Sequence, residues 1–255
     1  MTWHRIGNLA LAMLLLLTAT PAALSAEEAS KAGRWADPTK QAGSAKLMIS
    51  SGGGTLAPVY APLADYLVQY LELAGKKGVG IDVGGGPGTL VVELAKRTDL
   101  HWINSDINPH FFGHFYDMAE KAGVSHQVSA VRADATRLPF RDGYADVIVS
   151  RGSFHFWGDR TKGFAEIYRV LAPGGVAYIG RGFSPNLPPE TARRIRAKQG
   201  KKLKYDRRAL ADDLRAMMTG LGIRGFEVHV PCPPGAEGVS YGVWVEFRKP
   251  KEGHE

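Results

Sequence analysis

Apolar residues occur with two different spacings, which alternate along most of the chain. Short apolar runs that end at Asp, Asn or Gly are typical of strands, and apolar residues three or four positions apart are typical of helices. The predicted strands are residues 79–83, 101–104, 127–132, 145–150 and 176–180. The helices predicted before and between them are residues 62–74, 89–97, 109–122 and 161–171. Strands that alternate with helices at this spacing predict an α/β fold with a doubly wound parallel sheet.

The pattern changes toward the end of the sequence. Residues 206–220 are amphipathic with helical spacing, whereas residues 226–230 and 241–247 alternate apolar and polar side chains across a loop rich in proline and glycine. A period of two is typical of strands with one buried face, as antiparallel strands commonly have. We therefore expect a C-terminal antiparallel hairpin after the five parallel strands.

Residues 1–26 have the three parts of a secretory signal peptide. Arg5 precedes an uncharged apolar run at residues 9–17, and small residues at 22–26 supply a cleavage site. Cleavage predicts a periplasmic or secreted protein. Two alternatives remain open: a retained N-terminal membrane anchor, or a cytoplasmic protein whose start codon is misassigned.

The rest of the chain is long enough for one sizeable core but short for two. Residues 27–46 are small and polar, which predicts a flexible linker. Residues 47–250 form the predicted domain, with a basic insertion near 185–208. The single cysteine, Cys232, excludes an intrachain disulfide, so the domain must be stable on its core alone.

Positive charge is concentrated in residues 193–208 of that insertion, where Asp206 is the one acid. The cations are Arg193, Arg194, Arg196, Lys198, Lys201, Lys202, Lys204, Arg207 and Arg208. Such a segment is a solvated face, a lid over a site, or a contact for an anionic surface. The lack of interleaved aromatic residues for base stacking argues against nucleic acid.

A glycine-dense turn follows the first predicted strand and precedes a predicted helix. It carries Gly84, Gly86 and Gly88, with Asp82 at the end of the strand. A turn of this kind brings backbone N–H groups and a helix N-terminus close to a ligand. Thr89 occupies the position where a dinucleotide-binding fingerprint has its third glycine, which argues against a nicotinamide cofactor.

Further motifs lie where the next strands end. Asp106 follows the second strand about 20 residues after the glycine turn, as an acid that accepts ribose hydroxyls does. Asp134-Ala135 closes the third strand, Asp146–Ser150 lies within the fourth, and Arg169–Gly175 ends the helix before the fifth. Together with the glycine turn, this series resembles class I S-adenosylmethionine (SAM)-dependent methyltransferases, especially those of ubiquinone and menaquinone biosynthesis. The resemblance implies a Rossmann-like seven-stranded sheet and SAM as the methyl donor.

The resemblance also implies roles for individual residues. Gly84, Gly86 and Gly88 would pack against the methionine and ribose parts of SAM, and Asp82 would lie near the methionine amino group. Asp106 would hold the ribose hydroxyls. Asp134 and Ala135 would face the adenine. Arg151 would line the methionine end. The segment Gly152–Trp157 departs from the family's usual sequence, which leaves the acceptor undefined.

The chemistry of methyl transfer asks mainly for alignment and exclusion of water, because the donor carries the activated group. An oxygen or nitrogen acceptor also needs a base, and His155, just past the fourth strand, is the candidate catalytic residue. The alternative is a histidine that packs among its aromatic neighbours and shapes the pocket. His110 and His114 are four apart on a predicted helix, but without a third ligand nearby we predict no metal site.

The sequence therefore predicts an enzyme that transfers a methyl group from SAM to a small-molecule acceptor. Two alternatives remain: a non-catalytic SAM- or nucleoside-binding protein on the same fold, and an NAD-dependent oxidoreductase. The oligomeric state does not follow from the sequence.

Overall fold

The computed structural model describes residues 35, 37–52, 55–200 and 205–251. The predicted signal peptide, residues 1–26, lies outside these residues, so export stays a prediction. Within the described ranges, the helices are all too short or too polar to cross a membrane.

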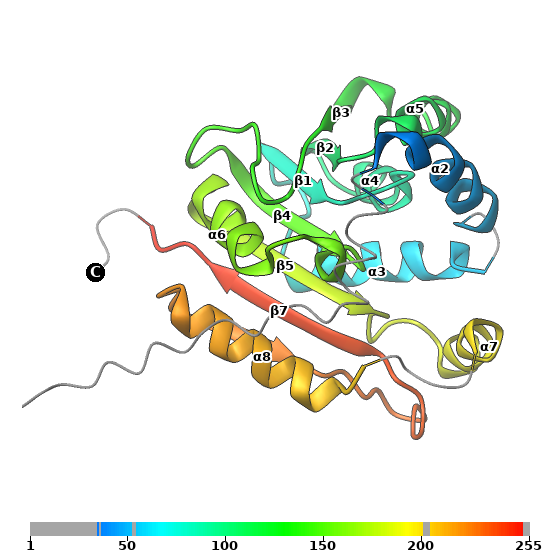
Figure 1. Ribbon diagram of the computed structural model, residues 1–255, viewed down its shortest axis with the longest axis vertical. Helices are drawn as coiled ribbons and strands as arrows, with labels where there is room; N and C mark the ends of the chain where they lie inside the picture. The colour runs from blue at the N-terminus through cyan, green and yellow to red at the C-terminus, as the bar shows by residue number, and fades with distance from the viewer. Residues whose placement is uncertain (1–34, 36, 53–54, 201–204, 252–255) are drawn as a thin grey trace, which may run out of the picture.

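A seven-stranded sheet forms the centre of the domain (Figure 1). The strands are β1 (Val79–Val83), β2 (His101–Asp106), β3 (Val128–Arg132), β4 (Ala145–Arg151), β5 (Leu171–Gly182), β6 (Phe226–His229) and β7 (Gly242–Arg248). Their spatial order is β3-β2-β1-β4-β5-β7-β6. The first five strands are parallel, and β7 is antiparallel to both β5 and β6. The predicted fold is confirmed, including the antiparallel C-terminal pair.

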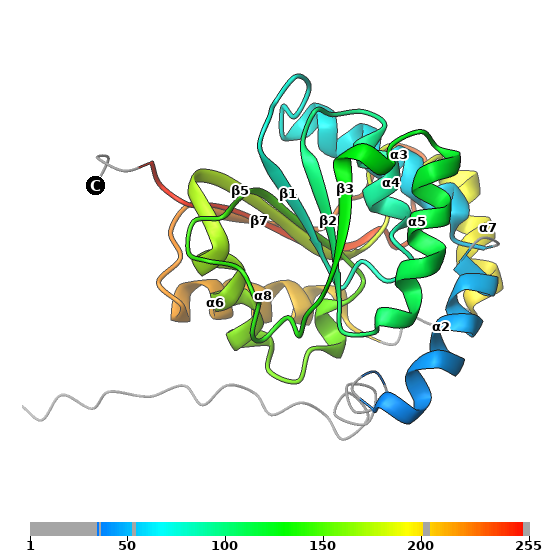
Figure 2. The same cartoon turned by 90° about the horizontal axis from the view of Figure 1, so that it is seen from above.

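Helices cover both faces of the sheet (Figure 2). They are α2 (Pro38–Gly52), α3 (Ala57–Tyr70), α4 (Thr89–Ala95), α5 (Phe112–Lys121), α6 (Arg160–Val170), α7 (Pro189–Gln199) and α8 (Arg207–Gly220), with the 3-10 turns η1 (Pro109–Phe111), η2 (Ser125–Gln127) and η3 (Phe154–Phe156). One core packs α3, α4 and α5 against the sheet through Leu63, Leu90 and Phe115. The other packs α6 and α8 through residues such as Ile167 and Leu214.

Helix α2 corrects the predicted linker. It begins at Pro38, inside the stretch 27–46 for which small polar residues predicted flexibility, and it crosses the predicted domain boundary at residue 47. Gln41 fixes it, since this side chain is only 2% exposed and donates to the Ile107 carbonyl. In return, Asn108 donates to the Gln41 carbonyl over 2.9 Å. These bonds join segments more than sixty residues apart, which local composition cannot reveal.

Helix α7 lies within the predicted basic insertion, beyond the carboxyl end of β5 (Figure 1). Its few apolar residues, Ala192 and Ile195, are buried in a small third core with Phe183 and Tyr241. Within the described part of the insertion, α7 therefore packs its apolar residues against the domain, and most of its charged residues are exposed.

Candidate functional site

A cavity of about 650 Å³ opens at the carboxyl ends of the parallel strands, where the strand order reverses between β1 and β4. Open α/β sheets bind ligands at this position. The cavity is lined by Asp82, Gly84, Gly86, Asp106, Asp134, Ala135, Arg151 and His155, all of which the sequence nominated. Gly88 is the one nominated residue that is not part of the lining.

The glycine turn explains this difference. Gly84 and Gly86 adopt φ angles of +71° and +56° and face the cavity. Gly88, with φ +79°, caps the N-terminus of α4 instead, and a Cβ atom there would overlap the Phe115 ring. We therefore assign Gly88 to helix–sheet packing rather than to contact with a ligand.

Asp106 organises the turn. Its two carboxylate oxygens accept hydrogen bonds from the backbone N–H groups of Gly86 and Asn108, each at 2.8 Å. Burial raises the pKa of Asp106 to about 6, against the opposing effect of these backbone donors. Each oxygen still has a lone pair for a further donor, as a ligand with two adjacent hydroxyls would supply.

Asp82 lies deeper in the same cavity and is only 2% exposed. Its Oδ1 atom is buried and has no hydrogen-bond partner among the described residues. Burial and, to a smaller extent, the charge of Asp106 raise its pKa to about 7, against the opposing effect of the charge of Arg151. A buried carboxylate with an open acceptor favours a cationic ligand group, such as an ammonium.

Asp134 and Ala135 line the cavity on the side of β3. Asp134 Oδ1 accepts from the backbone N–H and the hydroxyl of Thr136 at 2.8 and 2.9 Å, which fixes the turn after the strand. The loop that follows has no regular structure until β4, so its position depends on side-chain contacts.

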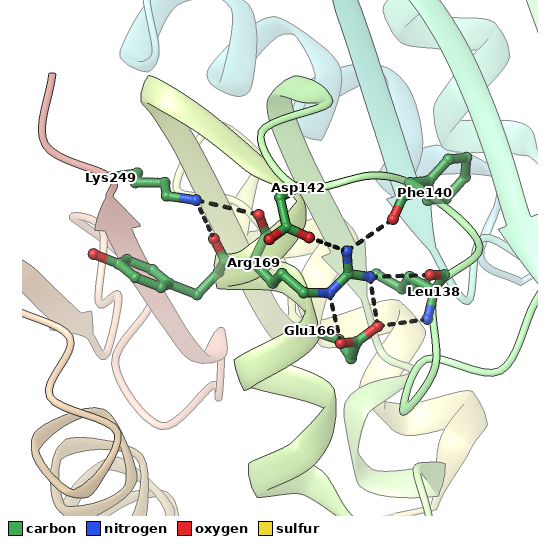
Figure 3. A network of polar contacts seen from close by, with 7 residues as sticks. Leu138, Phe140, Asp142, Glu166, Arg169 and Lys249 are labelled. Carbon is green, nitrogen blue, oxygen red and sulfur yellow. Dashed lines mark hydrogen bonds and ion pairs between the residues drawn. The ribbon is translucent and has the colours of Figure 1, made fainter. Parts of the chain in front are cut away.

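Arg169 on α6 provides those contacts (Figure 3). Its guanidinium donates to the carbonyls of Leu138 and Phe140 at 3.1 and 2.8 Å. Glu166 pairs with Arg169 at 2.8 Å and also accepts from the Leu138 N–H at 2.9 Å. The ion pair with exposed Asp142 contributes little, but the carbonyl contacts tie the loop after Asp134 to α6.

The segment after β4 forms the middle of the cavity wall. Arg151 Nε is buried without a hydrogen-bond partner in the described residues, and its guanidinium lies 5.2 Å from the centre of the Tyr60 ring. Ser153 donates to the Val83 carbonyl over 2.9 Å and thereby joins this segment to β1. The half-buried His155 ring lies 4.0 Å from the Phe156 ring, in a wall that Trp157 continues.

Two further parts of the lining were not predicted as site residues. Met48 on α2, Leu56 just before α3 and Tyr60 on α3 lie next to Trp35. The end of β5 and the α7 region contribute Arg181, Arg196, Gln199 and Tyr205. Only the basic run around Arg196 gave a signal in the sequence. The rest come from segments that the fold alone brings together.

The sheet order, the acid that holds the glycine turn and the cavity at the switch point are those of an α/β protein with the class I methyltransferase architecture. Residues 81–179 match the family model described as a methyltransferase domain. These residues are a class I SAM-dependent methyltransferase domain, distantly similar to the enzymes of quinone biosynthesis, and SAM is the methyl donor of that family.

Sequence relatives agree with the family model. The chain is 34% identical over 116 residues to 2-methyl-6-phytyl-1,4-hydroquinone methyltransferase 2 of Oryza sativa subsp. japonica, which is 45% of this chain and 32% of that protein. It is 32% identical over 111 residues to a ubiquinone/menaquinone biosynthesis C-methyltransferase of Vibrio campbellii, 43% of each chain. The chain thus spans a third to less than half of the length of these curated relatives.

A solved structure covers more of the molecule. A protein of Methanococcus maripaludis, provisionally classed as a SAM-dependent methyltransferase, superposes with a TM-score of 0.71 at 27% identity. The match covers 85% of this chain and 95% of that one.

Proposed function

We propose that this protein transfers the methyl group of SAM to a small organic acceptor that is largely apolar. One observation carries the proposal: a single cavity joins the carboxylates of β1 and β2 to a chamber walled by aromatic side chains. The Oryza sativa relative named above is a hydroquinone methyltransferase, which supports a small acceptor with an apolar body.

The residues present suit the donor. Asp106 would accept from the ribose hydroxyls, and Asp134 with Ala135 would contact the adenine. The open oxygen of Asp82 would accept from the methionine ammonium, and the buried Nε of Arg151 would donate to the methionine carboxylate. When bound, SAM supplies a methyl group already activated on a sulfonium.

The protein itself contributes alignment and a dry chamber. Trp35 and Phe156 contact one another edge to face at 5.8 Å and line the cavity with Trp157. His155 stands in the same wall, where it either takes a proton from an oxygen or nitrogen acceptor or shapes the pocket. A His155→Gln variant distinguishes the two roles, because loss of a base lowers kcat and changes its pH profile, whereas altered packing changes KM.

The test of the proposal is calorimetric titration of the full chain with SAM, S-adenosylhomocysteine (SAH, the demethylated product) and NAD. We expect micromolar binding of both sulfur nucleosides and none of NAD. A folded protein that binds neither nucleoside would refute the proposal. Binding without turnover of any acceptor in a methyl-transfer screen would favour the non-catalytic alternative.

The pH dependence of binding is a second prediction. In the free protein, burial raises the pKa of Asp82 to about 7 and that of Asp106 to about 6, from an ordinary value of 3.8. The folded protein therefore holds protons that the unfolded chain releases, and the free energy of unfolding falls as the pH rises from about 4 to about 7.

A ligand ammonium beside Asp82 favours the ionised form and lowers its pKa, so binding releases a proton in this range. We expect the affinity for SAH to rise by up to about tenfold between pH 6 and 7 and then to level off. Calorimetry at pH 6.5 in buffers of different ionisation enthalpy measures the released proton. Asp82→Asn should remove the pH dependence; an unchanged profile in this variant would assign it to another group.

A further inference from the structure

The cavity has an end that the donor does not account for. Adenosine contacts are assigned to the ends of β2 and β3, and methionine contacts to the ends of β1 and β4. Arg181, at the end of β5, and Arg196, on α7, line the cavity one strand farther along the sheet. If the donor binds as proposed, this end faces the acceptor.

Both arginines are held by aromatic faces rather than extended into solvent. The guanidinium of Arg181 lies 3.9 Å from the centre of the Tyr205 ring, and that of Arg196 lies 4.2 Å from the centre of the Phe183 ring. Arg196 also donates from Nε and Nη2 to the Ser240 carbonyl, at 3.1 and 2.9 Å. Stacked, hydrogen-bonded guanidiniums are preorganised for recognition of a planar or tetrahedral oxyanion.

Among the described residues that line this end of the cavity, the charged side chains are those of Arg151, Arg181 and Arg196. Burial lowers the pKa of Arg196, and the charges of Arg151, Arg181 and Arg207 lower it further against the opposing effect of Tyr205. The acceptors of its hydrogen bonds are neutral: the Ser240 carbonyl and the Gln199 side chain. Repulsion between like charges in a partly enclosed cavity costs free energy, and the attraction of a bound anion to the guanidiniums would offset this cost.

The basic run therefore has two sides. Arg193 and Arg194 on α7 are exposed, whereas Arg196 on the same helix lines the cavity and is only partly exposed. If the basic segment 193–208 were only a solvated face, we would not expect Arg196 to line the cavity.

We propose that Arg181 and Arg196 form an oxyanion subsite for the acceptor, so that the substrate combines an apolar body with a carboxylate or phosphate group. This inference rests on the proposed function. Arg151 would serve the donor's carboxylate, and the two arginines beyond it would anchor and orient the acceptor opposite the methyl group.

The experiment uses the full chain saturated with SAH. Two pairs of probes, phenyl phosphate with phenol and 4-hydroxybenzoate with 4-hydroxybenzamide, are titrated by ligand-observed NMR or calorimetry. The variants are Arg181→Gln and Arg196→Gln, with Arg194→Gln as the exposed control from the same helix. Thermal unfolding of each variant shows whether it is folded, and Arg181→Gln carries the test if Arg196→Gln is not.

We expect each anionic probe to bind the wild type and Arg194→Gln at least about tenfold more tightly than its neutral twin. Arg181→Gln should abolish most of this preference while the affinity for SAH stays within about twofold. Equal binding of anionic and neutral probes, or a preference that survives Arg181→Gln, would overturn the subsite. A fall in SAH affinity would instead assign these arginines to the donor. Absence of SAH binding in the wild type would refute the proposed function itself.

Discussion

Replacing Asp106 by asparagine will weaken SAH binding by about 1–3 kcal/mol, the range for loss of hydrogen bonds to a charged, buried acceptor. The carboxylate accepts from Gly86 and Asn108 and, in the proposed complex, from two ribose hydroxyls. An amide offers one acceptor oxygen in place of two, so either the turn or the ligand loses a partner.

Calorimetry with SAH measures this loss, and Asp212→Asn is the matched control. Asp212 carries the same charge but is exposed on α8, outside the cavity lining. Its variant should bind SAH as the wild type does. If Asp106→Asn bound SAH with unchanged affinity while remaining folded, the ribose contact would have to be sought elsewhere in the cavity.

The proposed adenosine half of the site follows well from the sequence. Each of its acids stands at the end of an apolar strand, and parallel strands bring their carboxyl ends to one edge of the sheet, so Asp106 and Asp134 could be placed from pattern alone. Most strand bounds could be predicted to within two residues for the same reason, since a strand buried on both faces is a continuous apolar run. Strand β5 is the exception, because it begins at Leu171 and the prediction placed its start at residue 176.

The acceptor half does not follow from the sequence. Tyr60 and Tyr205 are far apart in the chain, and no local period links them to each other or to Arg181. Helix α7 has only two buried residues, Ala192 and Ile195, so it offers too few apolar positions for a helical period to be recognised. Helix α2 is fixed by buried polar bonds of Gln41, a residue type that usually indicates solvent exposure. Both helices were therefore missed, and with them the walls of the chamber.

Two equally spaced glycines of the turn have different roles, because Gly86 lines the cavity and Gly88 packs against Phe115. We therefore predict different outcomes for the same substitution at the two positions. Gly86→Ala and Gly88→Ala both place a side chain at a positive φ angle, which costs roughly 1–2 kcal/mol. At Gly86 the nearest atom to a new Cβ is Met48 Sδ at 3.8 Å, so the folded protein has room. At Gly88 the new Cβ would overlap Phe115 and approach Asn104 Nδ2 to 2.8 Å.

We therefore expect Gly88→Ala to lower the free energy of unfolding by about 2–5 kcal/mol, backbone strain and overpacking together. Asn104 donates from its side-chain amide to the Gly86 carbonyl. A Cβ atom at Gly88 would push this amide away, so the turn would also lose that hydrogen bond. Gly86→Ala should lose only the strain term but bind SAH at least about tenfold more weakly, because the methyl group occupies space that the donor needs. Denaturant unfolding and calorimetry on the same two proteins measure both quantities. Equal destabilisation by the two substitutions would contradict the packing role of Gly88, and undiminished SAH binding by Gly86→Ala would remove Gly86 from the donor site.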